Sequence, residues 1–260
     1  MVKIFRAKAM LTSQRKQHIL AILQRDGQVI AKAVSQELAL SEDTIRRDLR
    51  ELAAEGLLQR VHGGALPASP AVADFASRNH IAADGKARIG RAAAQMIGDG
   101  QIAIVDGGTT AVQLTRQLPA SLHATIVTHS PSVAVELALH PHVEVILIGG
   151  RLFKHSVVTM GTAALAALAH IRADLFFMGV TGVHAQAGLS TGDLEEAHMK
   201  RALMQHASET IVLASAEKIG AASAYVIAPL AEASGIITET TIGDAQLAPL
   251  RGAGIVITQV

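Results

Sequence analysis

Residues 41–55 read SEDTIRRDLRELAAE and contain the clearest helical pattern in the chain. Ser41 is a favourable N-cap, a helix is predicted over residues 42–55, and Gly56 supplies a stop. Three apolar residues recur at i, i+4 and i+7 and form one face of this helix: Ile45, Leu49 and Leu52. Three arginines lie off that face: Arg46, Arg47 and Arg50. The segment therefore predicts a helix that packs through one side and presents arginine on another.

The flanking sequence completes a small module around this helix. It predicts four more elements in this order: a helix capped by Thr12 or Ser13 and ended by Asp26-Gly27, a minor strand at residues 28–30, a short helix at residues 31–38, and a strand at residues 57–61 followed by a tight turn at residues 62–64. This order is typical of a winged helix-turn-helix, which we place at residues 10–66. The third helix is then the recognition helix, which enters the major groove of DNA.

Nine residues of this module are candidates for contact with DNA: Ser41, Thr44, Arg46, Arg47, Arg50, Arg60, His62, Gly63 and Gly64. Thr44, Arg46 and Arg47 are expected to face the bases, and the others are expected nearer the phosphates or the minor groove. The alternative is that the arginines form a solvated helix face. They would then pair with four acidic neighbours: Glu42, Asp43, Asp48 and Glu51.

The net charge of +1 conceals an asymmetry between the two parts of the chain. Residues 1–66 contain 11 Lys and Arg against 7 Asp and Glu, whereas residues 67–260 contain 12 against 15. A basic module favours polyanions such as DNA, and this agrees with the pattern of the first module.

The composition excludes several other classes of protein. Half of the 260 residues are apolar, and there is no cysteine, which excludes a disulfide scaffold, a thiolate metal site and a cysteine nucleophile. The histidines are scattered, and His140-Pro-His142 lies in a turn-like segment, so we expect neither a metal nor a cofactor. No apolar run reaches about 18 residues, and the basic start lacks a long apolar stretch. We therefore expect no membrane span, no secretory signal and a cytoplasmic location.

The second module begins after a proline-containing segment. Residues 65–71 read ALPASPA, and we predict a linker over residues 67–80 and a second domain over residues 81–260. Seven strand-like segments occur in that domain, at residues 101–105, 125–127, 143–148, 173–178, 210–213, 235–238 and 255–258. Helical segments lie between most of them, so the fold class is α/β with a largely parallel sheet.

Polar and glycine residues follow many of these strands. The carboxyl ends of parallel strands lie at one edge of a sheet, where ligands bind, and glycines before a helix let backbone N–H groups approach a phosphate. The candidates for binding an anionic effector are Asp106, Gly107, Gly108, Thr109, Thr110, Thr128, His129, Ser130, Gly149, Gly150, Arg151, Gly179, Gly182 and Lys218. The alternative for each loop is an ordinary turn without a ligand.

Both modules resemble the DeoR-type bacterial transcription regulators. In the first module the resemblance rests on Arg15, Ile19, Leu23, Ser41, residues 44–49 (TIRRDL) and residues 60–65 (RVHGGA). In the second it rests on Lys86, residues 106–110, 128–130, 148–150, Gly161, and residues 174–182, 196–200 and 218–238. The resemblance covers roughly residues 10–240.

The resemblance implies a DNA-binding regulator that represses a sugar or carbohydrate operon and leaves its operator when a phosphorylated sugar-type effector binds. It implies a sensor domain similar in fold to ribose-5-phosphate isomerase and the CoA-transferases, and it adds Lys200 to the effector candidates. Family members begin near the equivalent of Met10-Leu11, so residues 1–9 are expected to be an extension or an incorrectly assigned start.

Two positions depart from the family pattern. Ser215 stands where an aspartate is usual, and His129 stands where an asparagine is usual. Both are expected near the pocket, so they bear on which effector binds. A role for His129 as a plain hydrogen-bonding residue is favoured over titration.

Two other functions remain open from the sequence. The second alternative is an enzyme, in which the α/β domain isomerises a sugar phosphate with Asp106 or Glu196 as base and Lys218 as electrostatic stabiliser. An exposed ion pair is the simpler account of Glu196 and Lys200. A structural DNA binder with a silent sensor domain is the third alternative. For the regulator we expect a homo-oligomer, a dimer or tetramer, because paired modules on paired half-sites multiply affinity.

Overall fold

The computed structural model describes residues 10–260, and the chain forms two compact units that divide between Ala68 and Ser69. We call the part up to Ala68 the N-terminal unit and Ser69–Val260 the C-terminal unit. The extension predicted for residues 1–9 lies outside the described residues.

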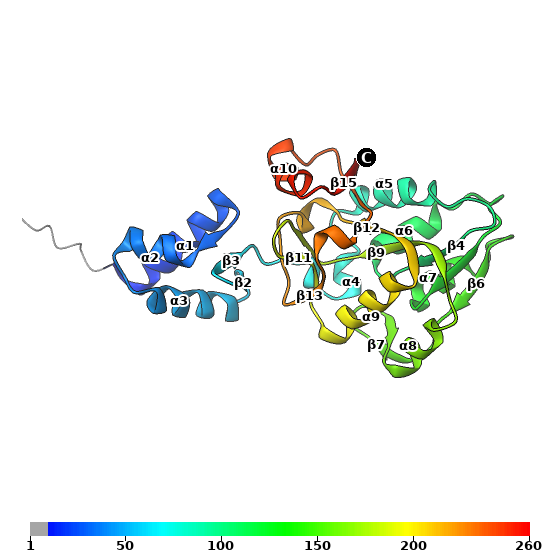
Figure 1. Ribbon diagram of the computed structural model, residues 1–260, viewed down its shortest axis with the longest axis horizontal. Helices are drawn as coiled ribbons and strands as arrows, with labels where there is room; N and C mark the ends of the chain where they lie inside the picture. Colours follow the sequence, from blue (N-terminus) through cyan, green and yellow to red (C-terminus); the bar gives the residue numbers. More distant parts are fainter. Residues whose placement is uncertain (1–9) are drawn as a thin grey trace, which may run out of the picture. The chain divides into compact units, whose positions relative to one another are not determined.

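The N-terminal unit consists of three helices and a small antiparallel sheet (Figure 1). Its elements are α1 (Thr12–Asp26), β1 (Val29–Ile30), α2 (Ala31–Leu38), α3 (Glu42–Ala54), β2 (Gln59–Val61) and β3 (Gly64–Leu66). The strand order is β1-β3-β2. This is the predicted winged helix-turn-helix, with α3 in the position of the recognition helix.

The boundaries of α3 follow from its sequence. The Ser41 hydroxyl caps the helix by accepting a hydrogen bond from the Thr44 backbone N–H at 3.2 Å. Gly56 follows the helix with a φ of +73°, which only glycine adopts without strain. The predicted apolar face is buried against α1 and α2 and consists of Ile45, Leu49 and Leu52.

Two local predictions in this unit are wrong. Leu11, and not Thr12 or Ser13, precedes the first turn of α1, and its backbone N–H donates to the Gln14 side chain at 3.2 Å. The strand expected from residue 57 begins at Gln59, because Leu58 turns into the core instead.

A buried ion pair joins α1 to α3. The Arg15 guanidinium donates from Nη2 to the Asp48 Oδ1 at 2.9 Å and from Nε to the other carboxylate oxygen. Asp48 is fully buried and Arg15 is almost so. A buried charge is tolerated only when its partner is present, so each of these residues requires the other.

We expect Arg15→Met to destabilise the protein by about 3 kcal/mol, because it leaves the Asp48 carboxylate buried and unpaired. The double variant Arg15→Met/Asp48→Leu should recover most of that loss, since it removes both charges. Urea unfolding followed by circular dichroism measures the effect. Arg25→Met, which removes an exposed arginine from the same helix, is the control and should unfold like the wild type. Equal stability of Arg15→Met and the wild type would contradict this account of the pair.

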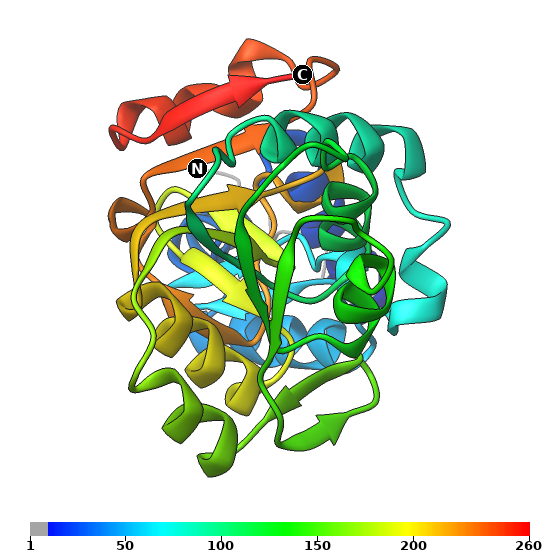
Figure 2. The same cartoon turned by 90° about the vertical axis from the view of Figure 1, so that its right-hand side faces the viewer.

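The C-terminal unit is built on a seven-stranded parallel sheet (Figures 1 and 2). The strands are β4 (Ile102–Val105), β5 (Thr125–Thr128), β6 (Glu144–Leu147), β9 (Ala173–Gly179), β12 (Ala207–Leu213), β14 (Gly235–Thr238) and β15 (Val256–Gln259). The helices are α4 (Phe75–Arg78), α5 (Ala83–Ala94), α6 (Thr109–Arg116), α7 (Pro131–Leu137), α8 (Thr162–Leu168), α9 (Leu194–Gln205) and α10 (Asp244–Gly252). The predicted α/β class and all seven predicted strands are confirmed.

The order of the strands creates a switch point in the middle of the sheet. The order is β15-β14-β12-β9-β4-β5-β6, so β4 and β9 are neighbours. From β4 the chain proceeds outward through β5 to β6, and from β9 it proceeds outward in the other direction. The loops after β4 and β9 therefore diverge to opposite sides, which opens a crevice at their carboxyl ends.

Helices cover both faces of this sheet, and each face has its own core (Figure 2). The predicted buried strand shows the alternation directly: Phe176 and Met178 pack on the face covered by α9, whereas Phe177 packs on the face covered by α5 and α6. All three side chains are fully buried.

Several smaller elements differ from expectation. Residues 67–80, expected to be a linker, include the 3-10 helix η1 (Pro70–Val72) and α4, and the structure groups everything from Ser69 with the C-terminal unit. Two groups of strands were not predicted from the sequence: the hairpin β7 (Arg151–Phe153) and β8 (Val158–Met160), and the small antiparallel sheet of β10 (Gly182–His184), β11 (Gly188–Thr191) and β13 (Tyr225–Ala228). These strands have three or four residues each, and although β7–β8 and β10–β11 are local hairpins, β13 pairs with β11 across a long stretch of chain.

Candidate functional site

The N-terminal unit presents its arginines on the side of α3 that does not pack. Arg46, Arg47 and Arg50 are exposed, and Thr44 is half-buried beside Ser41. Three further candidates are exposed on the β2–β3 wing: Arg60, His62 and Gly63. Gly64 begins β3, where an added Cβ would lie 1.7 Å from the Val29 carbonyl oxygen, so the close approach of β1 requires glycine at this position.

Most of these arginines have no acidic partner within the described residues. Arg46 pairs with Glu42 at 2.8 Å. Of the other three carboxylates, Asp48 binds Arg15 and Glu51 binds Lys16, whereas Asp43 makes no ion pair within residues 10–260. Within residues 10–260, Arg47, Arg50 and Arg60 make no ion pair, so their charges are available to a polyanion.

The C-terminal unit contains a pocket at the sheet's switch point. Its floor comes from the loops after β4 and β9, and one wall comes from the 3-10 helix η2 (Ala216–Lys218) after β12. The α6 amino end, where Gly108 has a φ of +109°, opens into the same pocket. A helix amino end presents unpaired N–H groups and positive potential, which favours an anion.

Four cationic side chains line this pocket: Arg78, Lys86, Lys200 and Lys218. Two guanidinium atoms of Arg78, Nε and Nη2, are buried and have no hydrogen-bond partner among residues 10–260. The Lys86 ammonium donates to the Arg78 carbonyl at 2.6 Å and so fixes the end of α4. Unpaired buried donors are rare in proteins, and here they point to an anionic ligand.

Burial disfavours the protonated, charged form of three of these groups. Burial lowers the pKa of Arg78 and of Lys86, and it lowers the pKa of the Lys218 ammonium to about 8. An anion in the pocket would offset this cost by restoring a counter-charge.

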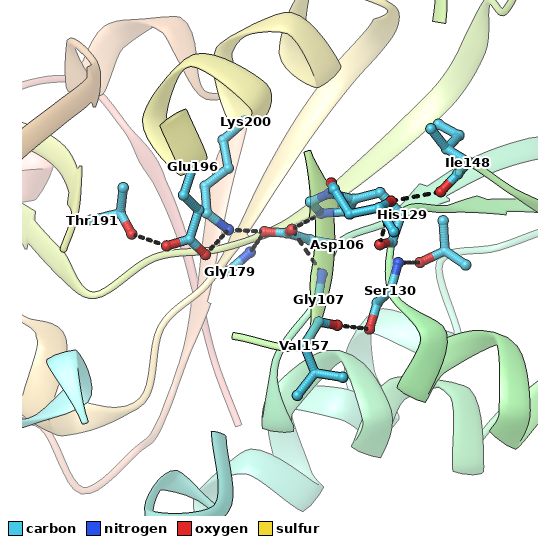
Figure 3. A network of polar contacts seen from close by, with 12 residues as sticks. Asp106, Gly107, His129, Ser130, Ile148, Val157, Gly179, Thr191, Glu196 and Lys200 are labelled. Atoms are coloured by element: carbon cyan, nitrogen blue, oxygen red, sulfur yellow. Dashed lines mark hydrogen bonds and ion pairs between the residues drawn. The ribbon is translucent and has the colours of Figure 1, made fainter. Parts of the chain in front are cut away.

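Asp106 organises the pocket from beneath (Figure 3). Its Oδ1 accepts from the Gly107 N–H at 2.7 Å and from His129 Nε2 at 2.8 Å. Its Oδ2 accepts from the Gly179 N–H at 2.8 Å and from the Lys200 ammonium. The carboxylate thus joins the ends of β4, β5 and β9 to α9.

These contacts make Asp106 a fixed anion. Burial alone would raise its pKa, but the Lys200 charge and the His129 and Lys200 hydrogen bonds outweigh burial and hold the pKa of Asp106 well below its usual range. With four donors on two oxygens, Asp106 has no free acceptor to take a proton from a substrate. The geometry therefore opposes its role as a catalytic base.

His129 continues this network. Its Nδ1 contacts the Thr159 carbonyl at 2.9 Å, so both of its ring nitrogens lie within hydrogen-bond distance of buried oxygens. Glu196 accepts from the Thr191 hydroxyl at 2.8 Å and lies 3.6 Å from Lys200. The expected exposed pair of Glu196 and Lys200 is wrong, because both side chains are buried.

The structure brings part of the predicted effector set together. Seven candidates line the pocket: Gly107, Gly108, Thr109, Thr110, Gly179, Lys200 and Lys218. Five lie behind it or pack against the backbone: Asp106, Thr128, His129, Ser130 and Gly182. Three are elsewhere: Gly149, Gly150 and Arg151, of which Arg151 is exposed and pairs with Glu195. They follow β6, which is the sheet's edge strand and lies away from the switch point.

Four polar residues that line the pocket were not predicted from the sequence: Arg78, Ser156, Thr181 and Glu217. Lys86 and Glu196 also line it, and the sequence had singled them out only for the family resemblance and, for Glu196, as a candidate base. Arg78 lay in the expected linker. One signal was available there, because Asp74 caps α4 by accepting from the Ser77 N–H at 2.8 Å, which is a helix start.

Two negative findings concern only the part of the chain from residue 10 onward. It contains no group of three or more His, Asp or Glu side chains that could hold a metal ion. None of its helices is long and apolar enough to cross a membrane.

A winged helix-turn-helix joined to an α/β unit with a cationic pocket defines a DNA-binding transcriptional regulator with a sensor domain. Residues 15–70 match the DeoR-like helix-turn-helix domain, and residues 81–240 match the DeoR C terminal sensor domain. The chain belongs to the DeoR family.

Named relatives agree with this assignment. The chain is 30% identical over 250 residues to the HTH-type transcriptional regulator GlpR of Haloferax volcanii, covering 95% of this chain and 98% of that protein. It is 30% identical over 212 residues to the glycerol-3-phosphate regulon repressor of Escherichia coli, covering 81% and 84%. Because such relatives are regulators, the chain is a regulator and not an isomerase.

Among solved structures, ribose 5-phosphate isomerase A from Methanocaldococcus jannaschii is similar at 17% identity and a TM-score of 0.39, covering 52% of this chain and 54% of that one. This likeness is weak, and it adds nothing on function.

We expect Asp106→Asn to destabilise the protein by about 3 kcal/mol at pH 7, because an amide nitrogen would face the donors on Gly179 or Lys200 and leave Lys200 short of counter-charge. Folding lowers the pKa of Asp106, so its contribution is present above the unfolded value of about 4 and is lost as pH falls through the folded value. The gap in unfolding free energy between wild type and variant should therefore narrow below about pH 4.

The double variant Asp106→Asn/Lys200→Met removes both charges and should recover part of the loss. Urea unfolding between pH 7 and pH 3 measures each case. A gap that stays constant over this range would rule out the ionised carboxylate as its source.

Proposed function

We propose that this DeoR-family chain represses an operon for sugar or polyol metabolism and releases its operator when a phosphorylated sugar-type effector occupies the C-terminal pocket. The main support is the set of four cationic side chains that line the pocket. Among residues 10–260, the buried Nε and Nη2 of one of them, Arg78, have no hydrogen-bond partner. A phosphate supplies oxygens for these donors and for the amino end of α6. The repressor of the glycerol-3-phosphate regulon, a relative, is named for a phosphorylated polyol, which supports the same ligand class.

The proposed site for DNA is α3 together with the wing. Thr44, Arg46 and Arg47 would face the bases, and Arg50, Arg60 and the residues 62–64 would contact phosphate or the minor groove. Because one such module binds weakly, we also propose a homo-oligomer, a dimer or tetramer, that acts in the cytoplasm on paired half-sites.

We expect Arg47→Ala to weaken binding to a specific operator about 5- to 100-fold, because a lost arginine contact to a base costs about 1–3 kcal/mol. The operator is first selected from a random DNA library with the wild-type protein. Fluorescence anisotropy at moderate salt then compares this DNA with a scrambled sequence. Arg25→Ala, an exposed arginine on α1, is the matched control and should bind like the wild type.

Two results would count against this part of the proposal. If Arg47→Ala binds the operator with the wild-type affinity, α3 does not contact DNA through Arg47 as proposed. Equal affinity of the wild type for operator and scrambled DNA would favour a structural DNA binder. Sedimentation of the same samples tests the oligomer, since a monomer that still binds tightly and specifically would exclude it.

The effector is identified by a thermal-melt screen against sugar and polyol monophosphates, in which a ligand at about 100 times its Kd adds roughly 2.7 kcal/mol of stability. We expect the affinity of the wild-type protein for this effector to fall about tenfold between pH 7 and pH 9. The Lys218 pKa is about 8, so the ammonium loses its proton in this range, while the phosphate is already dianionic above about pH 7.

Lys218→Arg is the control, because arginine stays charged to above about pH 12. The affinity of this variant for the effector should therefore not change between pH 7 and pH 9. Calorimetric titration at each pH measures both proteins. A wild-type affinity that does not change between pH 7 and pH 9 would show that Lys218 does not bind the anion. The same compound must dissociate the operator complex.

A further inference from the structure

Glu217 is an acidic side chain in a pocket otherwise dominated by cations. It lies in the middle of η2, directly after β12, and it lines the pocket next to Lys218. The Ser215 hydroxyl donates to its Oε1 at 2.7 Å, which fixes the carboxylate. The other oxygen, Oε2, is buried and has no hydrogen-bond partner among residues 10–260.

No neighbouring cation donates a hydrogen bond to this oxygen within residues 10–260, although the Glu217 charge partly offsets the effect of burial on the pKa of Lys86 and of Lys218. Within the described chain, Glu217 makes no ion pair, and the Lys86 ammonium is engaged by the Arg78 carbonyl. The two guanidinium atoms of Arg78 and the Glu217 Oε2 are therefore all buried, all unpartnered and all in one pocket. They do not satisfy one another, so they lie beyond hydrogen-bond reach of each other.

Each set of unpaired groups requires a different partner. The Arg78 N–H groups require an acceptor, and a negatively charged acceptor suits the surrounding cations best. The Glu217 oxygen requires a donor, and a hydroxyl group is the donor that sugars and polyols carry. Buried groups that lack a partner are costly, so a ligand that supplies both partners gains from both.

We propose that Glu217, held by Ser215, is a specificity-determining residue that accepts a hydrogen bond from a ligand hydroxyl while Arg78, Lys86 and Lys218 hold the ligand's phosphate. This inference rests on the proposed function and deepens it. The ligand class is a monophosphate ester of a polyhydroxy compound with a free hydroxyl in reach of the phosphate subsite.

The charge of Glu217 also excludes ligands. A second phosphate or a carboxylate at the hydroxyl position would face the Glu217 carboxylate at close range and be repelled. The pocket therefore discriminates against bisphosphates, although its net charge is positive. Of the two carboxylates that line the pocket, Glu196 accepts from Thr191 and lies beside Lys200, so selectivity comes from Glu217, which keeps an unpartnered oxygen among residues 10–260.

The test compares four probes: inorganic phosphate, glycerol 3-phosphate, fructose 6-phosphate and fructose 1,6-bisphosphate. Calorimetric titration and thermal melts measure their Kd for the wild type, Glu217→Met and Glu217→Gln. Methionine keeps the chain length and removes both oxygens, whereas glutamine keeps one acceptor and removes the charge. Glu209→Met is the matched control, since Glu209 is exposed near the opposite end of β12.

In the wild type, at least one monophosphate ester should bind more tightly than both inorganic phosphate and the bisphosphate. Glu217→Met should weaken binding of that ester about tenfold or more. Its affinity for inorganic phosphate should stay the same or rise, and its affinity for the bisphosphate should rise. Glu217→Gln should raise the affinity for the bisphosphate by a similar factor, but it should weaken binding of the ester less than Glu217→Met does. Opposite changes for ester and bisphosphate cannot arise from a loss of folding alone.

Three outcomes would overturn the inference. If Glu217→Met weakens inorganic phosphate and the ester by the same factor, Glu217 only supports the pocket. If the ester's Kd is unchanged, no hydroxyl reaches Glu217. If the wild type binds none of the four probes, the proposed phosphate pocket itself fails, and this result is distinct from the first two because it is visible before any variant is made.

Discussion

The Asp106 carboxylate, buried beneath the pocket, fixes the arrangement on which the C-terminal unit depends. It accepts from two backbone N–H groups, an imidazole and an ammonium, and these donors come from the ends of β4, β5, β9 and from α9. A buried ion is tolerable only when its surroundings satisfy it completely, so the four segments have one compatible arrangement. Asp106 therefore sets the shape of the pocket without lining it, and its saturated oxygens leave it no role in proton transfer.

The pocket above this network has the opposite character. Two of its lining side chains have buried polar atoms without a hydrogen-bond partner among residues 10–260: Arg78 at Nε and Nη2, and Glu217 at Oε2. This combination suits a binding site. The fully hydrogen-bonded Asp106 network holds the pocket rigid, and the unpartnered atoms that line the pocket can form hydrogen bonds with a ligand. The same contrast appears in the N-terminal unit. There Arg15 and Asp48 are paired and buried, whereas Arg47 and Arg50 are exposed without acidic partners among residues 10–260.

The sequence predicted local structure well and spatial neighbours less well. The α3 helix, its Ser41 cap and the seven strands of the sheet depend on short-range patterns, and the structure has them. The order of the strands depends on long-range packing. No local pattern showed that β9 lies beside β4 or that β6 lies at the edge, so Gly149–Arg151 were expected in a pocket that they do not reach. Arg78 was missed for a related reason. Its segment contains prolines and alanines that are typical of a linker, and the Ser69 and Asp74 caps were the only local signs of its two short helices.

The position of the ligand-facing groups has a consequence for evolution. Arg78 lies on α4 and Glu217 on η2, and both are short helices outside the central sheet. The buried network of Asp106, His129 and Lys200 belongs to the sheet and α9. Substitutions in the short helices can therefore change which metabolite is recognised without disturbing the scaffold. A lineage built on this fold can change the lining of this pocket through few mutations, whereas a change at Asp106 would leave His129 and Lys200 without their buried acceptor.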